Sequence, residues 1–344
     1  FVNGDEESDL DTAVSIARVA GEDVGSYIIT PSAAADSNYT VSFVTSDFTI
    51  TQAALTVTAS DQTKVYGATD PALTYSITGF QGTDEESDLD TAVSIARVVG
   101  ENVGSYVITP SAAADSNYTV SFVTSDFTIT QAALTVTASD QTKVYGATDP
   151  TLTYSITGFQ GTDTEASLDT GVSISRDVGE DVGSYTITPA DAVDSNYDIS
   201  FVTADFSITK AALTITSDSN QTKVYGATDP ALTYTITGFV NGDEESDLDT
   251  AVSIARVAGE DVGSYVITPS AAADSNYTVS FVTSDFTITQ AALTVTASDQ
   301  TKVYGATDPT LTYTITGFVN GDEESDLDTA VSIARVVGEN VGSY

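Results

Sequence analysis

The acidic run Gly242–Asp249 is the densest group of side chains in the sequence that could do chemistry. It reads Gly-Asp-Glu-Glu-Ser-Asp-Leu-Asp, and copies of it occur at Asp5–Asp11, Asp84–Asp90 and Asp322–Asp328. Calcium takes about six to eight oxygen ligands, and alternating carboxylates can supply several of them. The run therefore predicts weak calcium sites, with the ligands Asp84, Glu86, Asp88 and Asp90 in one copy and Asp243, Glu245, Asp247 and Asp249 in another.

A solvated acidic loop would have the same sequence, and this alternative stays open. The spacing differs from that of an EF-hand loop, because no glycine lies at its sixth position. The corresponding segment Asp163–Asp169 reads Asp-Thr-Glu-Ala-Ser-Leu-Asp and has lost two acidic groups. Apart from calcium, the sequence predicts no cofactor.

The composition excludes most other chemistry. The chain contains no Cys, Met, Trp or His, and therefore no thiol nucleophile, no imidazole base and no thiolate or imidazole ligand for zinc. Its 50 acidic and 10 basic residues give a net charge of −40, which argues against nucleic acid as a partner. No apolar run approaches the roughly 18 residues that span a membrane. We predict no catalytic residues and no enzyme activity.

Each long repeat also contains one lysine and one Asn-Tyr pair that could be modified. Some adhesin domains join such a lysine and asparagine in an isopeptide bond, and the pairs here are Lys64 with Asn117, Lys143 with Asn196 and Lys223 with Asn276. The segment Asp115–Thr119 also matches an acidic glycosylation sequon. The alternative is a lysine paired weakly with a nearby Asp and an asparagine in a turn.

These residues recur because the chain is built of repeats. The leucine of the segment Ala-Leu-Thr-Val-Thr falls at 79-, 79- and 80-residue intervals, at Leu55, Leu134, Leu213 and, with one residue inserted near Ser219, Leu293. A period of about 80 residues is the size of a small domain. We therefore divide the chain into a partial repeat (1–52), three full repeats (53–131, 132–210, which has diverged, and 211–290) and a second partial repeat (291–344).

Within a repeat, apolar and polar residues alternate. In the first full repeat this period of two covers the segments 55–60, 73–78, 118–122 and 126–130, with weaker strands expected at 93–97 and 106–109. The alternation is typical of half-buried antiparallel strands. Six or seven short strands indicate an all-β fold, a tandem array of small immunoglobulin-like β-sandwiches, with a β-grasp-like sheet as the alternative.

The connection between repeats contains no Gly, Pro or Ser-rich spacer. Two strand patterns meet across about three residues in Phe127–Thr137. We therefore expect neighbouring repeats to be closely coupled and the array to be rod-like, as beads on a string.

The segment Lys64–Pro71, Lys-Val-Tyr-Gly-Ala-Thr-Asp-Pro, with Leu-Thr-Tyr following at 73–75, resembles the signature of the YGX-type MBG repeats of large bacterial surface adhesins. Val103–Thr109, Asn117–Phe122 and Phe127–Thr130 are similar to later strands of that family. The resemblance covers essentially the whole chain. It implies a secreted, cell-surface stalk of tandem β-domains without catalytic residues.

The function expected from these features is structural. We expect a stalk or fibre segment of a secreted or surface-anchored adhesin on the bacterial cell surface, with any signal peptide, anchor or binding head outside this segment. The expected partners are other copies of the chain in a filament, or host and surface glycans bound through regions outside it. The alternatives are a self-assembling filament subunit and a repeat that itself binds glycans or mucin weakly and gains avidity from number.

Overall fold

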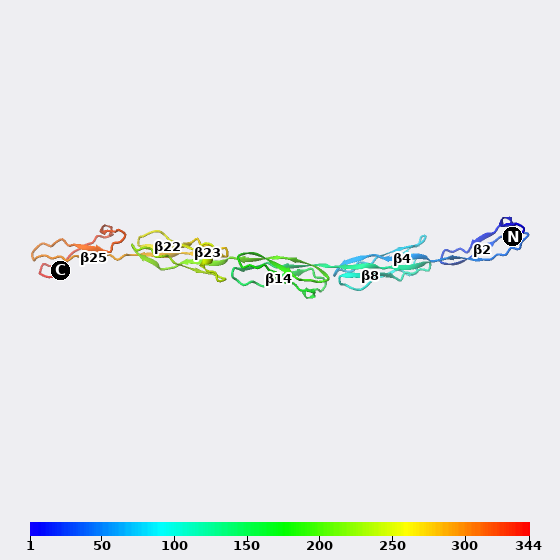
Figure 1. Cartoon of the computed structure of the whole chain (residues 1–344), viewed down its shortest axis with the longest axis horizontal. Helices are drawn as coiled ribbons and strands as arrows, with labels where there is room; N and C mark the ends of the chain where they lie inside the picture. Colours follow the sequence, from blue (N-terminus) through cyan, green and yellow to red (C-terminus); the bar gives the residue numbers. More distant parts are fainter. The chain divides into compact units, whose positions relative to one another are not determined.

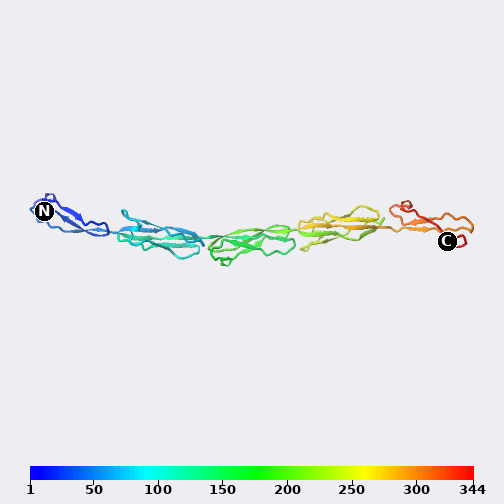
Figure 2. The same cartoon turned by 180° about the vertical axis from the view of Figure 1, so that it is seen from behind.

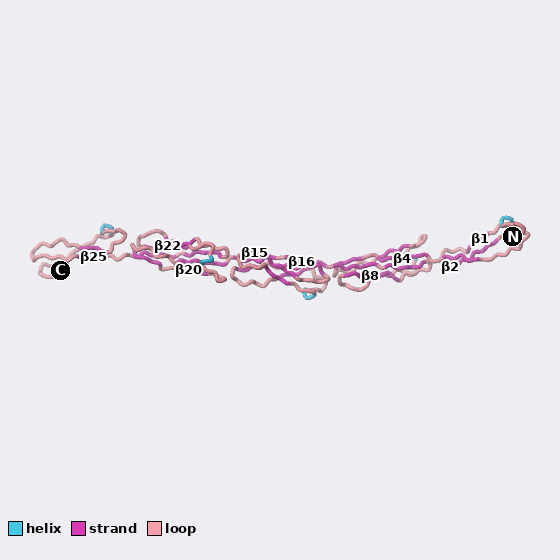
Figure 3. The backbone as a smooth tube through the Cα atoms, viewed as in Figure 1, coloured by secondary structure: helices cyan, strands magenta, loops and turns pink.

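The computed structural model describes residues 1–344, which form strands, loops and five single turns of 3₁₀ helix (Figure 3). The 3₁₀ turns each cover three residues of the acidic runs or their diverged copy: η1 (Glu7–Asp9), η2 (Glu86–Asp88), η3 (Glu165–Ser167), η4 (Glu245–Asp247) and η5 (Glu324–Asp326). The strands lie where apolar and polar residues alternate, because a strand turns successive side chains to opposite faces. The prediction of an all-β fold is confirmed.

The first full repeat has seven strands in two sheets. They are β4 (Ala53–Ala59), β5 (Gln62–Val65), β6 (Tyr75–Thr78), β7 (Ser94–Arg97), β8 (Gly104–Ser111), β9 (Tyr118–Val123) and β10 (Ser125–Thr130). One sheet has the strand order β6-β4-β9 and the other β5-β10-β8-β7. Strand β4 of the first sheet lies beside β8 of the second (Figure 1, Figure 2).

The core of this repeat lies between the two sheets. Ala59 of β4 packs with Ile108, Phe127 and Ile129 of the other sheet. Ile108 and Phe127 are fully buried, and Ile129 is 1% exposed. Burying an aromatic or branched aliphatic side chain contributes about 1.5–3 kcal/mol. A two-layer β-sandwich is therefore the fold of the repeat, and the β-grasp alternative is wrong, because no helix packs on either sheet.

The expected antiparallel pairing holds for most strands of the repeat but not for two pairs. Strand β4 pairs antiparallel with β6 but parallel with β9, in a register that places Leu55 beside Val120. Strand β5 likewise pairs parallel with β10, with Thr63 beside Thr128. The chain leaves β4 for β5 in the second sheet within two residues, so that one short segment supplies an inner strand to one sheet and an edge strand to the other.

The other two full repeats follow the same strand order. The repeat 132–210 has the sheets β13-β11-β16 and β12-β17-β15-β14, and the repeat 211–290 has β20-β18-β23 and β19-β24-β22-β21. The strands of the former are β11 (Ala132–Ala138), β12 (Gln141–Val144), β13 (Tyr154–Thr157), β14 (Ser173–Arg176), β15 (Gly183–Ala190), β16 (Tyr197–Val202) and β17 (Ala204–Thr209). Those of the latter are β18 (Ala211–Ser217), β19 (Gln221–Val224), β20 (Tyr234–Thr237), β21 (Ser253–Arg256), β22 (Gly263–Ser270), β23 (Tyr277–Val282) and β24 (Ser284–Thr289).

The partial repeats contain fewer strands. The segment 1–52 has β1 (Ser15–Arg18), β2 (Gly25–Ser32) and β3 (Ser46–Ile50), and 291–344 has β25 (Thr294–Ala297) and β26 (Tyr313–Thr316). By Cα proximity the chain falls into two units, one of Phe1–Ala138, Thr153–Ile174 and Thr188–Thr203 and the other of Ser139–Leu152, Ser175–Ile187 and Ala204–Tyr344. The repeats 53–131 and 211–290 each lie within one unit.

Candidate functional site

The carboxylates of the acidic run each have a separate hydrogen-bond partner. Asp84 accepts a bond from the hydroxyl of Tyr118 at 2.6 Å, and Asp90 accepts one from the amide of Ser116 at 2.9 Å. Asp88 accepts the amide of Glu85 at 2.8 Å, and Glu86 accepts the hydroxyl of Tyr75. The run therefore closes a 3₁₀ turn and ties it to neighbouring strands.

The second predicted calcium set is arranged in the same way. Asp243 accepts the hydroxyl of Tyr277, Asp247 the amide of Glu244 and Asp249 the amide of Ser275, at 2.8, 2.8 and 2.7 Å, and Glu245 accepts the hydroxyl of Tyr234. The chain contains no group of three or more Asp or Glu side chains close enough to hold a metal ion. The carboxylates thus face different partners, and calcium binding stays a prediction.

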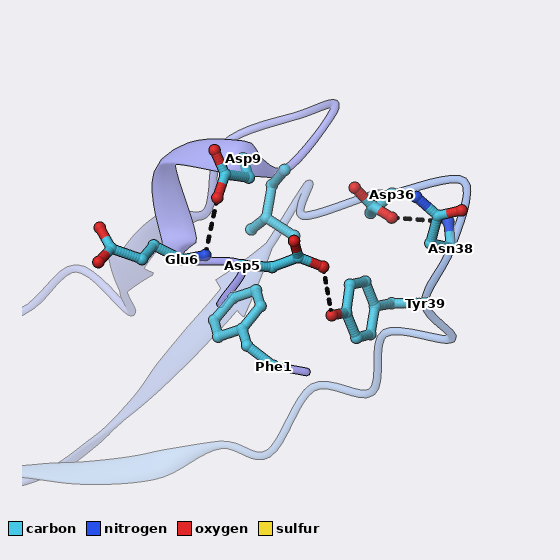
Figure 4. Close-up of a pocket in the computed structure, with 8 residues that line it drawn as sticks. Phe1, Asp5, Glu6, Asp9, Asp36, Asn38 and Tyr39 are labelled. Carbon is cyan, nitrogen blue, oxygen red and sulfur yellow. Dashed lines mark hydrogen bonds between the residues drawn. The ribbon is translucent and has the colours of Figure 1, made fainter. Parts of the chain in front are cut away.

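The same turn recurs in the N-terminal partial repeat, where it lines a small pocket (Figure 4). Asp5 accepts the hydroxyl of Tyr39 at 2.7 Å, and Asp9 accepts the amide of Glu6 at 2.8 Å. Phe1 packs edge to face on Tyr39, with the ring centroids 5.7 Å apart. The position of Phe1 is taken by Phe80, Phe159 and Phe239 in the full repeats.

The lysine of each repeat is buried in a four-residue ion network. Lys64, whose side chain is 4% exposed, lies 2.7 Å from Asp70 and also pairs with Glu101. Arg97 binds both oxygens of Asp70, at 2.5 and 3.1 Å, and contacts Glu101 at 2.7 Å. The guanidinium of Arg97 also lies over the ring of the buried Phe127, 4.5 Å from its centroid. This ion network therefore lies directly beside the apolar core of the sandwich.

The network shifts the pKa values of its members. Hydrogen bonds from Arg97, then from Lys64, lower the pKa of Asp70 to about 2. Burial lowers the pKa of Lys64, but the bonds with Asp70 and Glu101 outweigh it and leave that pKa raised. The amine is therefore held as an ammonium ion, which is a poor nucleophile. Asn117, the predicted isopeptide partner of Lys64, bonds instead to the preceding repeat.

The junctions between repeats form the most elaborate side-chain site of the chain. Tyr66, at the end of β5, packs against Ala132, Leu134 and Tyr197 of the next repeat. The rings of Tyr66 and Tyr197 meet edge to face, with centroids 5.4 Å apart and planes at 79°. Both hydroxyls donate to the same oxygen, Oδ2 of Asp163, at 2.9 Å from Tyr66 and 2.6 Å from Tyr197. One carboxylate thus joins two repeats.

The next junction repeats this geometry in the other unit. Tyr145 and Tyr277 lie with their ring centroids 5.4 Å apart at 82°. Their hydroxyls donate to Oδ2 of Asp243 at 2.9 and 2.8 Å. Burial and the bond with Asp163 raise the pKa of Tyr197 to about 12, and burial is likewise the largest cause that raises the pKa of Tyr277 to about 12.

An asparagine supplies a second bond across each junction. Oδ1 of Asn196 accepts the amide of Val103 in the preceding repeat at 2.9 Å, and Oδ1 of Asn276 accepts that of Val182 at 2.8 Å. Asn117 accepts the amide of Val24 in the partial repeat at 2.8 Å. The asparagine of the predicted sequon is therefore a junction residue, and its Nδ2, the atom to which a glycan would attach, donates to Asp23 of the partial repeat at 3.2 Å.

Glycine follows the junction tyrosine because nothing larger fits. Gly67 has a φ of +78°, and a Cβ there would lie 2.5 Å from Cβ of Gln160 in the next repeat. Gly146 has a φ of +79°, and its Cβ would lie 2.4 Å from a methyl group of Val240. The Tyr-Gly pair of the Lys64–Pro71 segment is therefore in direct contact with the next repeat.

The short connection between repeats follows from the sequence, but these partners do not. The acidic residues singled out for calcium include Asp84 and Asp243, and the aligned position in the diverged repeat is Asp163. That repeat lacks the acidic groups at 164 and 167 but keeps this one. The signal in the sequence that points to the junction is this retained aspartate, together with the Tyr-Gly pair that recurs unchanged in every full repeat.

Comparisons with known proteins agree with the repeat pattern. The model of the MBG domain (YGX type) matches residues 1–49, 55–128, 134–207, 213–287 and 293–344. None of the curated proteins compared with the chain matches it. The structure has no helix of the length and apolarity that crossing a membrane requires.

Among solved structures, the chain is similar to the three N-terminal domains of the bacteriophage RB49 Highly Immunogenic Outer Capsid protein (Hoc). The identity is 13%, the match covers 81% of this chain and 99% of that chain, and the TM-score is 0.22. A TM-score of this size supports no conclusion about fold or function. The family match rests on the sequence instead, and because its five segments cover most of the 344 residues, the chain belongs to the YGX-type MBG domain family.

Proposed function

We propose that the chain is a stalk or fibre segment of a secreted or surface-anchored bacterial adhesin, with no enzyme activity of its own. Its role is to hold a binding head at a distance from the cell. The matched family is one of structural repeat domains. The observation that carries the proposal is the repeated junction, in which Tyr66, Asp163 and Tyr197 join two consecutive repeats.

The junction supports this role because it restricts bending. A chain of domains on flexible linkers would swivel at each connection, whereas here the connection is one residue, Gln131, between β10 and β11. The side-chain amide of Gln131 donates from Nε2 to the carbonyl of Tyr197 at 2.9 Å. Hydrogen bonds of this kind contribute about 1 kcal/mol each and an aromatic pair about 0.5–1.5 kcal/mol. Several such hydrogen bonds, together with the aromatic pair, hold one repeat in a fixed orientation on the next.

Charge supports extension as well. The repeat 53–131 contains ten acidic side chains against Lys64 and Arg97, which gives it a net charge of −8. Neighbouring repeats therefore repel one another over roughly one Debye length, about 8–10 Å in physiological salt. The junction contacts resist collapse at short range and the charges oppose folding back at longer range.

Small-angle scattering of the purified chain tests the stalk. We expect the radius of gyration of a stiff array, and a decrease when Tyr66→Ala and Tyr145→Ala are combined, because both junction pairs are then lost. Tyr304→Ala is the matched control, since Tyr304 has the same place in its repeat but is 73% exposed. A wild-type chain as flexible as the double variant would contradict a stiff stalk.

Protease shaving of intact bacteria tests the location, and release of no peptides would contradict a surface protein.

A filament subunit is the second candidate, and the edge strand β9 favours it. This strand ends the sheet β6-β4-β9, and its residues Phe122 and Val123 are 39% and 45% exposed. The same exposed pairs recur at Phe201 and Val202 and at Phe281 and Val282. An edge strand whose outer side is unpaired and which exposes apolar side chains is a template for pairing with another chain. Electron microscopy distinguishes the two, because single thin particles favour the stalk and ordered fibres favour assembly. Weak glycan binding by the repeats remains a further alternative, which a glycan array on the whole chain would test.

A further inference from the structure

The side chains that normally oxidise first are absent from this protein. It contains no Cys, Met, Trp or His, but 17 Tyr. Thiols and thioethers are the usual first targets of oxidants. Without them, and without indole or imidazole, the phenol of tyrosine is the most readily oxidised side chain left. One-electron oxidation of the chain therefore leads to tyrosyl radicals.

At two places a tyrosine radical would form in contact with a second tyrosine. Tyr66 contacts Tyr197, and Tyr145 contacts Tyr277, each pair with ring centroids 5.4 Å apart. Because both hydroxyls of a pair bond to one carboxylate oxygen, the hydroxyl ends of the two rings converge on one point. The carbons ortho to the hydroxyls are two covalent bonds from the hydroxyl oxygens, so the ortho positions of both rings lie near the same carboxylate.

The shared carboxylate also serves the chemistry of oxidation. A phenol that loses an electron becomes a strong acid and must release its proton. Asp163 already accepts hydrogen bonds from the hydroxyls of Tyr66 and Tyr197, and Asp243 accepts them from those of Tyr145 and Tyr277. Tyr197 and Tyr277 are 3% exposed, so that water has little access to them and the carboxylate is the nearest proton acceptor.

We propose that the Tyr66–Tyr197 and Tyr145–Tyr277 contacts are modification sites at which a one-electron oxidant joins neighbouring repeats covalently through dityrosine. The oxidant is of the peroxidase class with hydrogen peroxide, or a photo-oxidant. Each phenol loses one electron and one proton. The two radicals then form a carbon–carbon bond between ortho positions, and each of the two ortho hydrogens moves to the phenolic oxygen of its own ring, which restores both aromatic rings and both hydroxyls. In all, two hydrogen atoms leave the pair, and one hydrogen peroxide is reduced to two waters.

The link would give the stalk a covalent tie at each junction. A cross-link between distant parts of a chain stabilises the folded state mainly by constraining the unfolded chain, as a disulfide does. The chain has no cysteine for that purpose. The tyrosine pair occupies the place between repeats where such a tie would resist extension.

The test is photo-oxidation of the dilute full chain with a ruthenium tris-bipyridyl complex and persulfate, followed by trypsin and mass spectrometry. We expect two linked pairs of peptides, 65–97 with 177–210 and 144–176 with 257–302, each lighter by two hydrogen atoms than the sum of its parts. Dityrosine fluorescence should rise in monomeric protein.

Matched variants identify the residues. Tyr66→Phe should abolish the first linked pair and leave the second, which serves as the control inside the same molecule. Asp163→Asn should lower the yield of the first pair alone, since Asp243 still serves the second. Tyr304→Phe, at the exposed tyrosine, should change neither. Equal linking among other tyrosines, links mainly between molecules, survival of the first pair in Tyr66→Phe, or tyrosine oxidation without either link would each overturn the proposal.

Discussion

Tyr66 and Tyr197 belong to consecutive repeats, yet their hydroxyls donate to one oxygen of Asp163 and their rings meet edge to face at 5.4 Å. The contact couples the folding of one sandwich to that of the next. Tyr66 packs against the apolar cluster that Tyr197 forms with Ala132 and Leu134. A repeat in this chain is therefore stabilised in part by its neighbour.

The first prediction concerns the hydroxyl of Tyr66. Tyr66→Phe removes one bond to Asp163 but keeps the ring, so we expect the junction to weaken by about 1 kcal/mol, the usual net value of such a bond. Hydrogen exchange at the amide of Val103, which donates to Asn196 across the same junction, is the measurement. Tyr304→Phe is the control, because Tyr304 is exposed. Equal exchange in both variants would contradict a role for the hydroxyl.

The second prediction separates backbone strain from contact between repeats. Gly67 and Gly305 have φ values of +78° and +81°, but a Cβ at Gly67 meets Gln160 whereas one at Gly305 meets nothing within 4 Å. Both alanine variants incur the left-handed backbone cost of about 1 kcal/mol. Only Gly67→Ala should in addition speed hydrogen exchange at Val103. If Gly67→Ala speeds hydrogen exchange at Val103 no more than Gly305→Ala does, the close approach of Gly67 to the next repeat does not stabilise the junction.

The third prediction is a loss of stability in acid. The pKa of Asp70 is lowered to about 2 by Arg97 and Lys64, against an ordinary value of 3.8. A lowered pKa in the folded state means that the unfolded chain takes up the proton first, so the contribution of Asp70 is complete above pH 4 and disappears as the pH falls toward 2. The urea midpoint should therefore fall over this range, and less so in Asp70→Asn. Asp126→Asn, at an exposed carboxylate outside the network, should keep the wild-type slope.

The fourth prediction lies at alkaline pH. Burial and Asp163 raise the pKa of Tyr197 to about 12 from 10.0. Here the unfolded chain releases its proton first, so the contribution of Tyr197 is complete below pH 10 and is lost as the pH rises toward 12. Two units of pKa correspond to about 2.7 kcal/mol at most. The unfolding free energy should decline between these pH values, and Tyr197→Phe should show a shallower decline. An unchanged slope in that variant would contradict the assignment.

The fold was largely predictable from local pattern, because strands such as β4 and β10 alternate apolar and polar residues without interruption. Strand β5 was not predicted, since its four residues contain Lys64, a charged residue that is buried only because Asp70 and Glu101 lie opposite it. The junction partners were also beyond local reasoning. Asp163 lies 34 residues from Tyr197 and 97 from Tyr66, and only the packing of two domains brings the three together.

The fifth prediction distinguishes a structural acidic turn from a calcium site. Asp88 accepts the amide of Glu85, and in the diverged repeat Ser167 accepts the amide of Thr164 at 3.2 Å, so that a hydroxyl performs the task of the carboxylate. If the turn is structural, Asp88→Ser should leave the melting temperature near its wild-type value and Asp88→Ala should lower it, because only alanine leaves the amide without its partner. If calcium binds, millimolar calcium should raise the melting temperature, least for the repeat 132–210, and both variants should reduce that rise in their own repeat. If both the serine and the alanine variants lose the calcium-induced rise in melting temperature equally, the result favours a metal site. If calcium has no effect and only the alanine variant has a lower melting temperature, the carboxylate of Asp88 belongs to the turn.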